Sequence, residues 1–147
     1  MPAKKESGIT RKVIGVLTVL LVIFILIMMR LVSGIQGTAR VVNYAGLVRG
    51  GTQRWIKMEI TGNPRDKMME AVESYIDGLQ NGSEDLGLVR LKDAKYQAKV
   101  EEQKEYFQKL KEEVQHVRES GYDNTNIIED SETFFQICDD ATGLAEA

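Results

Sequence analysis

The sequence is poor in the residue types from which disulfides, metal centres and nucleophilic active sites are built. Its 147 residues include one cysteine, Cys138, and one histidine, His116. A single cysteine excludes a disulfide within the chain. With one histidine and no carboxylates clustered at ligand spacing, we expect no metal site, no cofactor and no Cys/His nucleophile. No acid–base pair indicates catalysis either, so the sequence favours a protein that is not an enzyme.

Charge is absent from residues 13–29, which read VIGVLTVLLVIFILIMM with Thr18 as the only polar side chain. Beyond Arg30, two more apolar residues extend the run to residue 32. This length is sufficient for a helix that crosses a bilayer. The alternative is a cleaved signal peptide with a weak cleavage site at residues 32–34, but the apolar run of such a peptide is usually about 7 to 15 residues long. We therefore predict an uncleaved transmembrane helix at residues 13–32.

The charges on the two sides of this helix predict its orientation. Four basic residues precede the apolar run of residues 13–29 and two follow it closely: Lys4, Lys5, Arg11 and Lys12, then Arg30 and Arg40. The positive-inside rule then places residues 1–12 in the cytoplasm and residues 33–147 outside the inner (cytoplasmic) membrane. Residues 31–147 carry 14 basic and 21 acidic side chains, a net charge of −7. Such a domain does not attract nucleic acid or an anionic membrane through its overall field, and an anion site must be built locally.

Glycine and asparagine residues divide the exterior part into predicted helices. Gly62 is expected to end the first helix, with Asn63 as N-cap and Pro64 as the first residue of the second. Asn126, followed three residues later by Glu129, resembles a capping box for the last helix. The predicted helices cover residues 13–61, 64–81, about 94–120 and 127 onward.

Apolar periodicity predicts how these helices pack. The third helix has an a/d heptad seam that consists of Tyr96, Val100, Gln103, Phe107, Leu110, Val114 and Val117. Shorter seams on the second and fourth helices consist of Met68, Val72, Tyr75 and Leu79, and of Ile128, Ser131, Phe135, Cys138, Ala141 and Ala145. Three helices with one seam each need a fourth to close a core. We therefore predict an all-α fold in which an N-terminal transmembrane helix continues into an antiparallel four-helix bundle.

The first helix carries two rows that lie on nearly opposite sides at 100° per residue. The rows are Ile35, Ala39, Val42, Gly46, Arg49, Gln53, Ile56 and Ile60, and Tyr44, Val48, Gly51, Trp55 and Met58. One buried face suffices inside a single bundle. The other face is expected to pack against the same helix of a second protomer, which predicts a homodimer through the first helix.

Within this helix, the stretch NYAGLVRGGTQR at residues 43–54 combines glycines, each costing about 1 kcal/mol relative to alanine, with arginines. Gly46 and Gly50 are four residues apart and allow another backbone to approach. Arg49 occupies a seam position, where an unpaired cation is costly. It therefore needs a counter-charge.

Two interpretations supply that counter-charge. If the seam faces its two-fold mate, a small anion held between Arg49 and the same arginine of the second protomer removes their repulsion. Asn43, Gln53 and Arg54 would then add donors from neighbouring turns. In the other interpretation, Arg49 pairs with an aspartate or glutamate of another helix, and the glycines only allow tight packing.

Residues 42–54, VNYAGLVRGGTQR, resemble the (I/V)NxAGxxRxxxQR signature of bacterial periplasmic sensory domains. These four-helix input domains belong to nitrate/nitrite sensor histidine kinases and to the N-terminal family of type IV pili methyl-accepting chemotaxis (PilJ-type) receptors. Residues 96–114 and 131–147 look like the third and fourth helices of such domains. The resemblance covers roughly residues 10–147, and the motif is its specific part.

The resemblance implies a ligand-sensing input domain in which Arg49 contacts the ligand at the dimer interface and Gly46 and Gly50 line the site. This chain departs from the pattern at Gly50-Gly51, where a larger residue is usual, and at Leu47, where chemoreceptors often have arginine. Such receptors continue into a second transmembrane helix and a chemotaxis, kinase or diguanylate cyclase module. We expect the chain to be the input portion of such a receptor; the alternative is a bitopic helical scaffold that binds proteins and no ligand.

Overall fold

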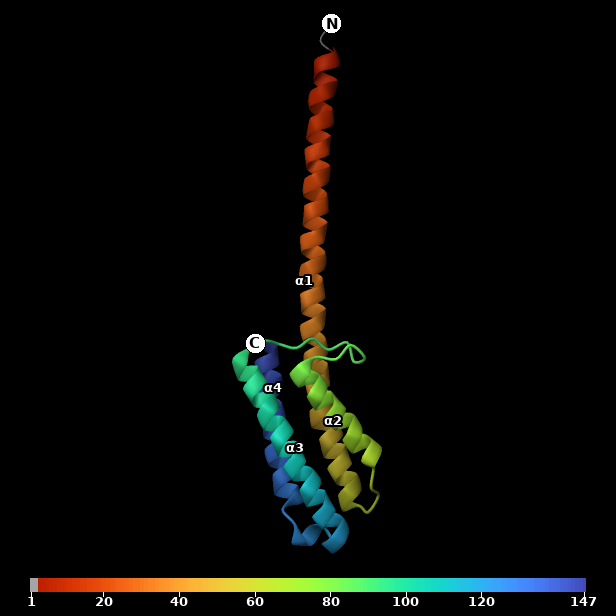
Figure 1. The fold of residues 1–147 in the computed structure, drawn as a ribbon, viewed down its shortest axis with the longest axis vertical. Helices are drawn as coiled ribbons and strands as arrows, with labels where there is room; N and C mark the ends of the chain where they lie inside the picture. The colour runs from red at the N-terminus through yellow and green to blue at the C-terminus, as the bar shows by residue number, and fades with distance from the viewer. Residues whose placement is uncertain (1–2) are drawn as a thin grey trace. The chain divides into compact units, whose positions relative to one another are not determined.

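The computed structural model describes residues 3–147 and contains four α-helices, one short 3-10 helix and no strand within that range (Figure 1). The elements are α1 (Ala3–Ile60), α2 (Asp66–Asn81), α3 (Ala94–Ser120), η1 (Tyr122–Asn124) and α4 (Ile127–Glu146). The predicted all-α class is confirmed. The chain divides into two units, one that ends at Gln36 and one that comprises Gly37–Ala147.

In the first unit, α1 carries the apolar run that the sequence singled out. All residues from Gly8 to Gln36 are exposed. The hydroxyl of Thr18 donates a hydrogen bond of 2.9 Å to the carbonyl of Ile14, so the one polar side chain of the run is satisfied within the helix. By length and composition, this is the one helix in the described part of the chain that is long and apolar enough to cross a membrane.

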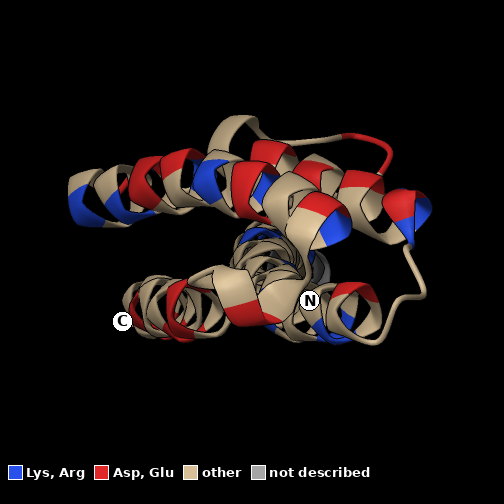
Figure 2. Ribbon diagram, turned by 90° about the horizontal axis from the view of Figure 1, so that it is seen from below, with Lys and Arg blue, Asp and Glu red and all other residues tan. Residues whose placement is uncertain are grey.

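The second unit is a bundle in which the final part of α1 packs with α2, α3 and α4, successive helices running in opposite directions (Figure 1). The α3 seam is confirmed in full, since all seven of its predicted residues are buried. At the centre, Phe107 of α3 lies between Trp55 of α1 and Phe134 of α4, with ring centroids 5.5 and 5.8 Å apart. Three different helices therefore contribute to one aromatic core. Acidic and basic residues both occur along α2 and α3, whereas α4 carries acidic residues and no basic one (Figure 2).

The buried row of α1 differs from both predicted rows. It consists of Val41, Ala45, Val48, Thr52, Trp55, Ile56 and Glu59. Two of its members, Thr52 and Glu59, are polar, so apolar periodicity alone does not reveal this row. The side chains of both are hydrogen-bonded. The Thr52 hydroxyl donates to the Val48 carbonyl at 2.8 Å, and Glu59 accepts from Trp55 and Arg118. A threonine and a glutamate can occupy a core because their polar atoms find partners there.

The start of α2 also differs from the prediction. Asn63 and Pro64 lie in the connection, and the N-cap is Arg65. Gly62 adopts φ +73°, while its amide donates to Glu59 and the amide of Asn63 donates to Met58. This is a Schellman closure of α1, and it uses the residue that would otherwise cap α2.

The start of α4 agrees with the prediction in position but not in chemistry. Asn126 is the N-cap residue, yet its side chain makes no capping bond, so the capping box does not form. The amide of Ile127 instead donates to the Thr125 hydroxyl at 3.4 Å. Ile127 is buried, whereas Ile128, predicted in the seam, is 61% exposed. The buried row of α4 therefore starts one residue earlier than expected.

Candidate functional site

The motif stretch of residues 43–54 lies in the bundle part of α1, and its central arginine has a partner within the chain. A guanidinium nitrogen of Arg49 forms an ion pair with Oδ1 of Asp139 on α4. The guanidinium also lies over the ring of Phe135, 5.2 Å from its centroid. The side chains of Arg49 and Asp139 are 36% and 54% exposed. The structure thus contains the interhelical pair of the second interpretation, at a position open to solvent.

Gln53 provides another polar contact between the same two helices. Its side-chain amide donates a 3.0 Å hydrogen bond to the backbone carbonyl of Ser131 on α4. Part of the row that the sequence assigned to a second protomer therefore faces α4 of the same chain.

The remaining candidate residues lie on the outer side of α1. Asn43, Gly50 and Arg54 are exposed, and Gly46 is half-buried. A methyl group added to Gly46 or Gly50 would meet no atom within 4 Å. Both glycines therefore face open space within this chain.

All six candidates share one side of the helix, although they do not converge on a point within one chain. At 100° per residue they span an arc of about 140°, from Arg49 beside α4 to Arg54 in solvent. Leu47, which is 45% exposed, lies about 20° beyond the Arg54 end of this arc. Arg49 and Gln53 at one end of the arc contact α4, whereas Asn43, Gly50 and Arg54 toward the other end are exposed.

Gly51 has a different environment from Gly50, its neighbour in the sequence. A methyl group on Gly51 would lie 2.8 Å from the side chain of Val72. This glycine therefore serves the contact between α1 and α2. The second interpretation, in which the glycines allow tight packing, therefore describes Gly51.

A polar pair lies in the core next to the candidate site. The side-chain amide of Gln103 donates to Sγ of Cys138 at 3.0 Å, and both side chains are fully buried. Burial raises the pKa of the Cys138 thiol to about 12, although the Gln103 hydrogen bond and the charge of Arg49 act in the opposite direction. At neutral pH the thiol is protonated and inert, so it supplies no nucleophile.

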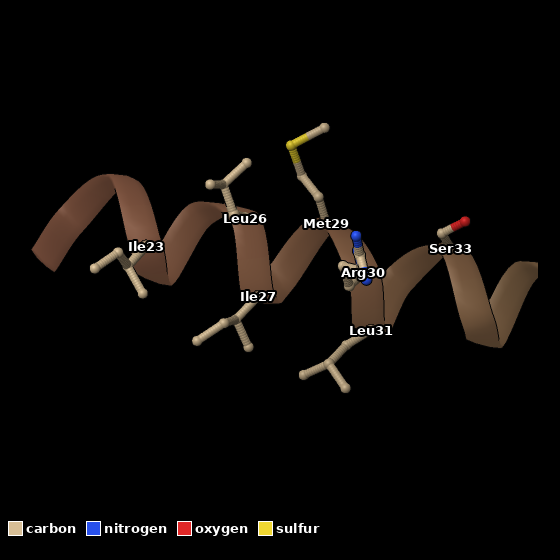
Figure 3. A pocket seen from close by; sticks show the side chains of 7 residues that line it. All are labelled: Ile23, Leu26, Ile27, Met29, Arg30, Leu31 and Ser33. Carbon is tan, nitrogen blue, oxygen red and sulfur yellow. The ribbon is translucent and has the colours of Figure 1, made fainter. Parts of the chain in front are cut away.

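Surface hollows in the structure do not identify another ligand site. One hollow is lined by residues of α1 alone, which project from one helix (Figure 3). Another hollow lies beside Gln53 and the first turns of α4, but Glu129 and Glu132 also line it, which disfavours an anion there. Within residues 3–147, no group of three or more His, Cys, Asp or Glu side chains is placed to hold a metal ion.

Asp139, the partner of Arg49, was not among the site residues predicted from the sequence. Asp139 follows Cys138, a correctly predicted seam residue of α4. Positions that flank a heptad seam often carry the charges that pair between helices. A search for carboxylates at the positions beside each predicted seam would therefore have identified Asp139 as a candidate partner.

Comparison with known proteins assigns no family, since no protein-family model, curated protein or solved structure matches this chain. The relation to periplasmic sensory domains stays a prediction based on residues 42–54.

Proposed function

We propose that this chain is the ligand-sensing input domain of a bacterial transmembrane receptor of the chemoreceptor, sensor kinase or diguanylate cyclase type. In this proposal, residues 13–32 anchor it in the inner membrane, and the bundle lies on the extracytoplasmic side. Two copies associate through α1, and a small ligand such as an anion binds at their interface. Arg49 is the main contact, with Gly46, Gly50, Asn43, Gln53 and Arg54 around it.

The observation that carries this proposal is the environment of Arg49. The arginine is held in place by Asp139 and Phe135, yet more than a third of its side chain is exposed. Solvent-exposed ion pairs contribute only about 0–1 kcal/mol. A bound anion with two oxygens can therefore replace the aspartate at little cost, because a guanidinium offers a forked pair of donors.

The surface beside Arg49 supports a second protomer as the other half of the site. Gly46 and Gly50 leave room on the outer side of α1. A two-fold contact along this side brings the two copies of Arg49 toward each other. An anion between them would favour the dimer.

Replacement of Asp139 by a ligand supplies a route for the signal. Because Asp139 belongs to α4, release of its ion pair removes one tie between α4 and α1. A small relative shift of two packed helices is a common response at such interfaces. In this mechanism, ligand binding changes the position of α4 relative to α1.

Membrane anchoring is supported by the first unit. Apolar side chains surround α1 from residue 13 to residue 29, and all of them are exposed. A helix that is apolar on every side needs an apolar environment on every side, which a bilayer provides.

The ligand proposal is tested by thermal unfolding of the full chain in detergent micelles, with and without nitrate, phosphate and small carboxylates. A ligand present at 100 times its dissociation constant stabilises a protein by about 2.7 kcal/mol. We expect one of these anions to raise the melting temperature of the wild type, and Arg49→Ala to abolish that increase. Asp139→Asn is the matched control, since it breaks the same ion pair but keeps the arginine and should bind the anion at least as well. Equal shifts in the wild type and Arg49→Ala would refute the proposed site.

The dimer is tested by disulfide cross-linking. Asn43→Cys is expected to form cross-linked dimers in membranes because position 43 lies on the outer side of α1. Lys67→Cys on α2 is also exposed and should not cross-link. Cys138 does not interfere because it is buried. Cross-linking at position 67 but not at position 43 would contradict a dimer through α1.

A bitopic helical scaffold without a ligand is the second candidate. The pairing of Arg49 with Asp139 favours it, because the arginine is neutralised within the chain. If this function is correct, no small anion changes the melting temperature, whereas position 43 still forms cross-links.

A further inference from the structure

The connection between α2 and α3 contains a closed turn fixed to the bundle core. Backbone hydrogen bonds join Ser83 and Leu88 in both directions, at 2.9 and 2.8 Å. Gly87 adopts φ +62° within this turn, a conformation that favours glycine. Leu88 is only 5% exposed and belongs to the hydrophobic core. The turn is therefore held in a defined position on the bundle.

The same connection is attached to the first residues of α1 that belong to the bundle. A guanidinium nitrogen of Arg40 donates to the carbonyl of Leu86 at 3.4 Å. Val89 packs on Gly37, where a methyl group would lie 3.1 Å from a Val89 methyl. These contacts fix the connection at the end of the bundle where α1 enters it.

Residues 86–92, LGLVRLK, contain two basic residues and no acidic one, and we call this segment the basic loop. It belongs to a unit whose net charge is −7. Arg90 and Lys92 are exposed, and Val89 is 48% exposed. Arg90 is oriented by two hydrogen bonds, from Nε to the carbonyl of Gln80 at 3.0 Å and from a terminal guanidinium nitrogen to Oε1 of Gln97 at 3.5 Å.

Acidic residues flank the basic loop but do not neutralise it. Glu84 and Asp85 precede it and are exposed. Asp93 follows it, and its carboxylate accepts the amide of Tyr96 at 2.8 Å as the N-cap of α3. The structure shows no ion pair from any of these three carboxylates to Arg90 or Lys92.

Chain length limits the distance between the basic loop and the predicted membrane helix. Gly37 follows the last residue of that helix, Val32, by five residues. Five residues span about 7.5 Å in a helix and at most about 18 Å when fully extended. The headgroup region adds about 5–7 Å on each side of the hydrocarbon core. Whatever the orientation of the bundle, the loop attached to Gly37 stays close to the lipid headgroups.

We propose that the basic loop docks on the anionic headgroups of the leaflet from which the bundle emerges. Val89 inserts at the interface, and Arg90 and Lys92 contact lipid phosphates. An exposed apolar residue followed by two cations suits this environment, because the apolar group enters the interface while the cations meet negative charge. This inference rests on the membrane anchor of the proposed function, but not on its ligand or dimer. Docking would hold the start of the bundle part of α1, through Gly37 and Arg40, at the membrane surface.

The test uses the full chain with an environment-sensitive fluorophore on Val89→Cys. Because Cys138 is buried and its thiol is protonated, the label goes to position 89. The chain is reconstituted into vesicles of phosphatidylcholine alone, or of equal parts phosphatidylcholine and phosphatidylglycerol, each with a lipid-borne quencher. Ile128→Cys is the control, since Ile128 is also an exposed aliphatic residue but belongs to the first turn of α4, which starts at the end of the bundle opposite the α2–α3 connection (Figure 1).

We expect lipid quenching at position 89, stronger in the anionic vesicles, and little quenching at position 128. Arg90→Gln with Lys92→Gln should reduce the docked-to-free ratio in anionic vesicles by roughly five-fold per cation. Equal quenching at positions 89 and 128, or equal quenching at position 89 in both lipids, would overturn the inference. Flotation of the chain with vesicles reports the anchor separately. A chain that does not float contradicts the anchor, whereas a floating chain without quenching at position 89 contradicts the docking alone.

Discussion

Arg49 and Asp139 join α1 to α4 through an ion pair whose two side chains are partly exposed. The guanidinium of Arg49 also lies over the aromatic ring of Phe135, which is one turn before Asp139 on α4. Exposed pairs of this kind contribute little to stability because water and salt screen them. The ion pair therefore connects the two helices but adds little stability. A bound anion can replace Asp139 only if the pair is weak in this way.

A double-mutant cycle measures the strength of this contact. Arg49→Ala and Asp139→Ala are each expected to reduce the free energy of unfolding by less than about 1 kcal/mol, with a coupling energy of about 0.2–1 kcal/mol. Urea unfolding of the wild type, the two single variants and the double variant gives the coupling. A coupling above about 2 kcal/mol would mean that the pair is a structural lock, and an anion would not replace Asp139 easily.

The adjacent glycines of the motif should respond in opposite ways to alanine. Gly50→Ala is expected to stabilise the bundle by up to about 1 kcal/mol, because alanine favours a helix and its methyl group meets no atom within 4 Å. Gly51→Ala should destabilise it, because the methyl group would lie 2.8 Å from the branched side chain of Val72. Thermal unfolding in detergent measures both changes. If Gly51→Ala instead stabilised the bundle, the side chain of Val72 on α2 would have to move away from the new methyl group at little energetic cost.

Among substitutions of charged residues, loss of Arg118 is expected to cause the largest decrease in the free energy of unfolding. Its guanidinium binds Glu59 through two hydrogen bonds of 2.9 and 2.6 Å and also contacts Asp66. The Glu59 side chain is 1% exposed, so Arg118→Met leaves a buried carboxylate without its cation. We expect a loss of about 2–4 kcal/mol, somewhat below the range for fully buried pairs because Arg118 is partly exposed.

Lys104→Met is the control for this variant. Lys104 lies on the same helix and pairs with Asp77, and both side chains are well exposed. Its loss should cost less than about 1 kcal/mol. Similar losses for the two variants in urea unfolding would mean that burial of Glu59 does not determine the effect.

Replacement of the buried Gln103 by an apolar residue is expected to increase the free energy of unfolding. Its amide nitrogen has only the weak acceptor Cys138 Sγ, and its Oε1 is buried without a partner in the structure. Gln103→Met keeps a similar volume and removes the unpaired oxygen, so we expect an increase of about 1–2 kcal/mol in the free energy of unfolding. The midpoint of urea unfolding measures this change. A loss of stability would indicate that Gln103 makes a bond that favours the native state.

Acid should weaken the contact between α2 and α3 through Glu73. Hydrogen bonds from Lys111 and Gln108 hold the pKa of this carboxyl below its ordinary value of 4.5. A carboxylate with a lowered folded-state pKa stabilises the fold above the unfolded pKa and loses that contribution as the pH falls through the folded value. Melting temperatures measured downward from pH 5 should therefore fall more steeply for the wild type than for Glu73→Gln. Glu70→Gln, on the exposed side of the same helix, should retain the wild-type slope.

Regular apolar spacing was sufficient to predict α3. Its seven seam residues form an uninterrupted heptad pattern, and Gln103 was correctly included because it occupies a seam position. The Asp93 cap and Gly121 at the two ends also mark the limits of this helix clearly. Local signals and burial agree there, which is why sequence reasoning gave both its bounds and its buried face.

The bundle part of α1 was predicted as a helix, but its buried face was not predicted correctly. Thr52 and Glu59 interrupt the apolar pattern, and the partner of Glu59, Arg118 on α3, becomes known only from the folded chain. The same limit applies to the candidate site. The need of Arg49 for a counter-charge follows from the sequence, but the choice of Asp139 depends on the rotation of α4.

The sequence by itself determined the helical class, the apolar run of residues 13–29 and the position of the glycine–arginine stretch, because these depend on composition and on spacing along one helix. The tertiary structure decided which side of each helix is buried. It also gave Arg49 a partner 90 residues away, separated the roles of Gly50 and Gly51, and attached the basic loop to Gly37. These features depend on the relative rotation of packed helices, which the total set of contacts fixes and no single segment encodes.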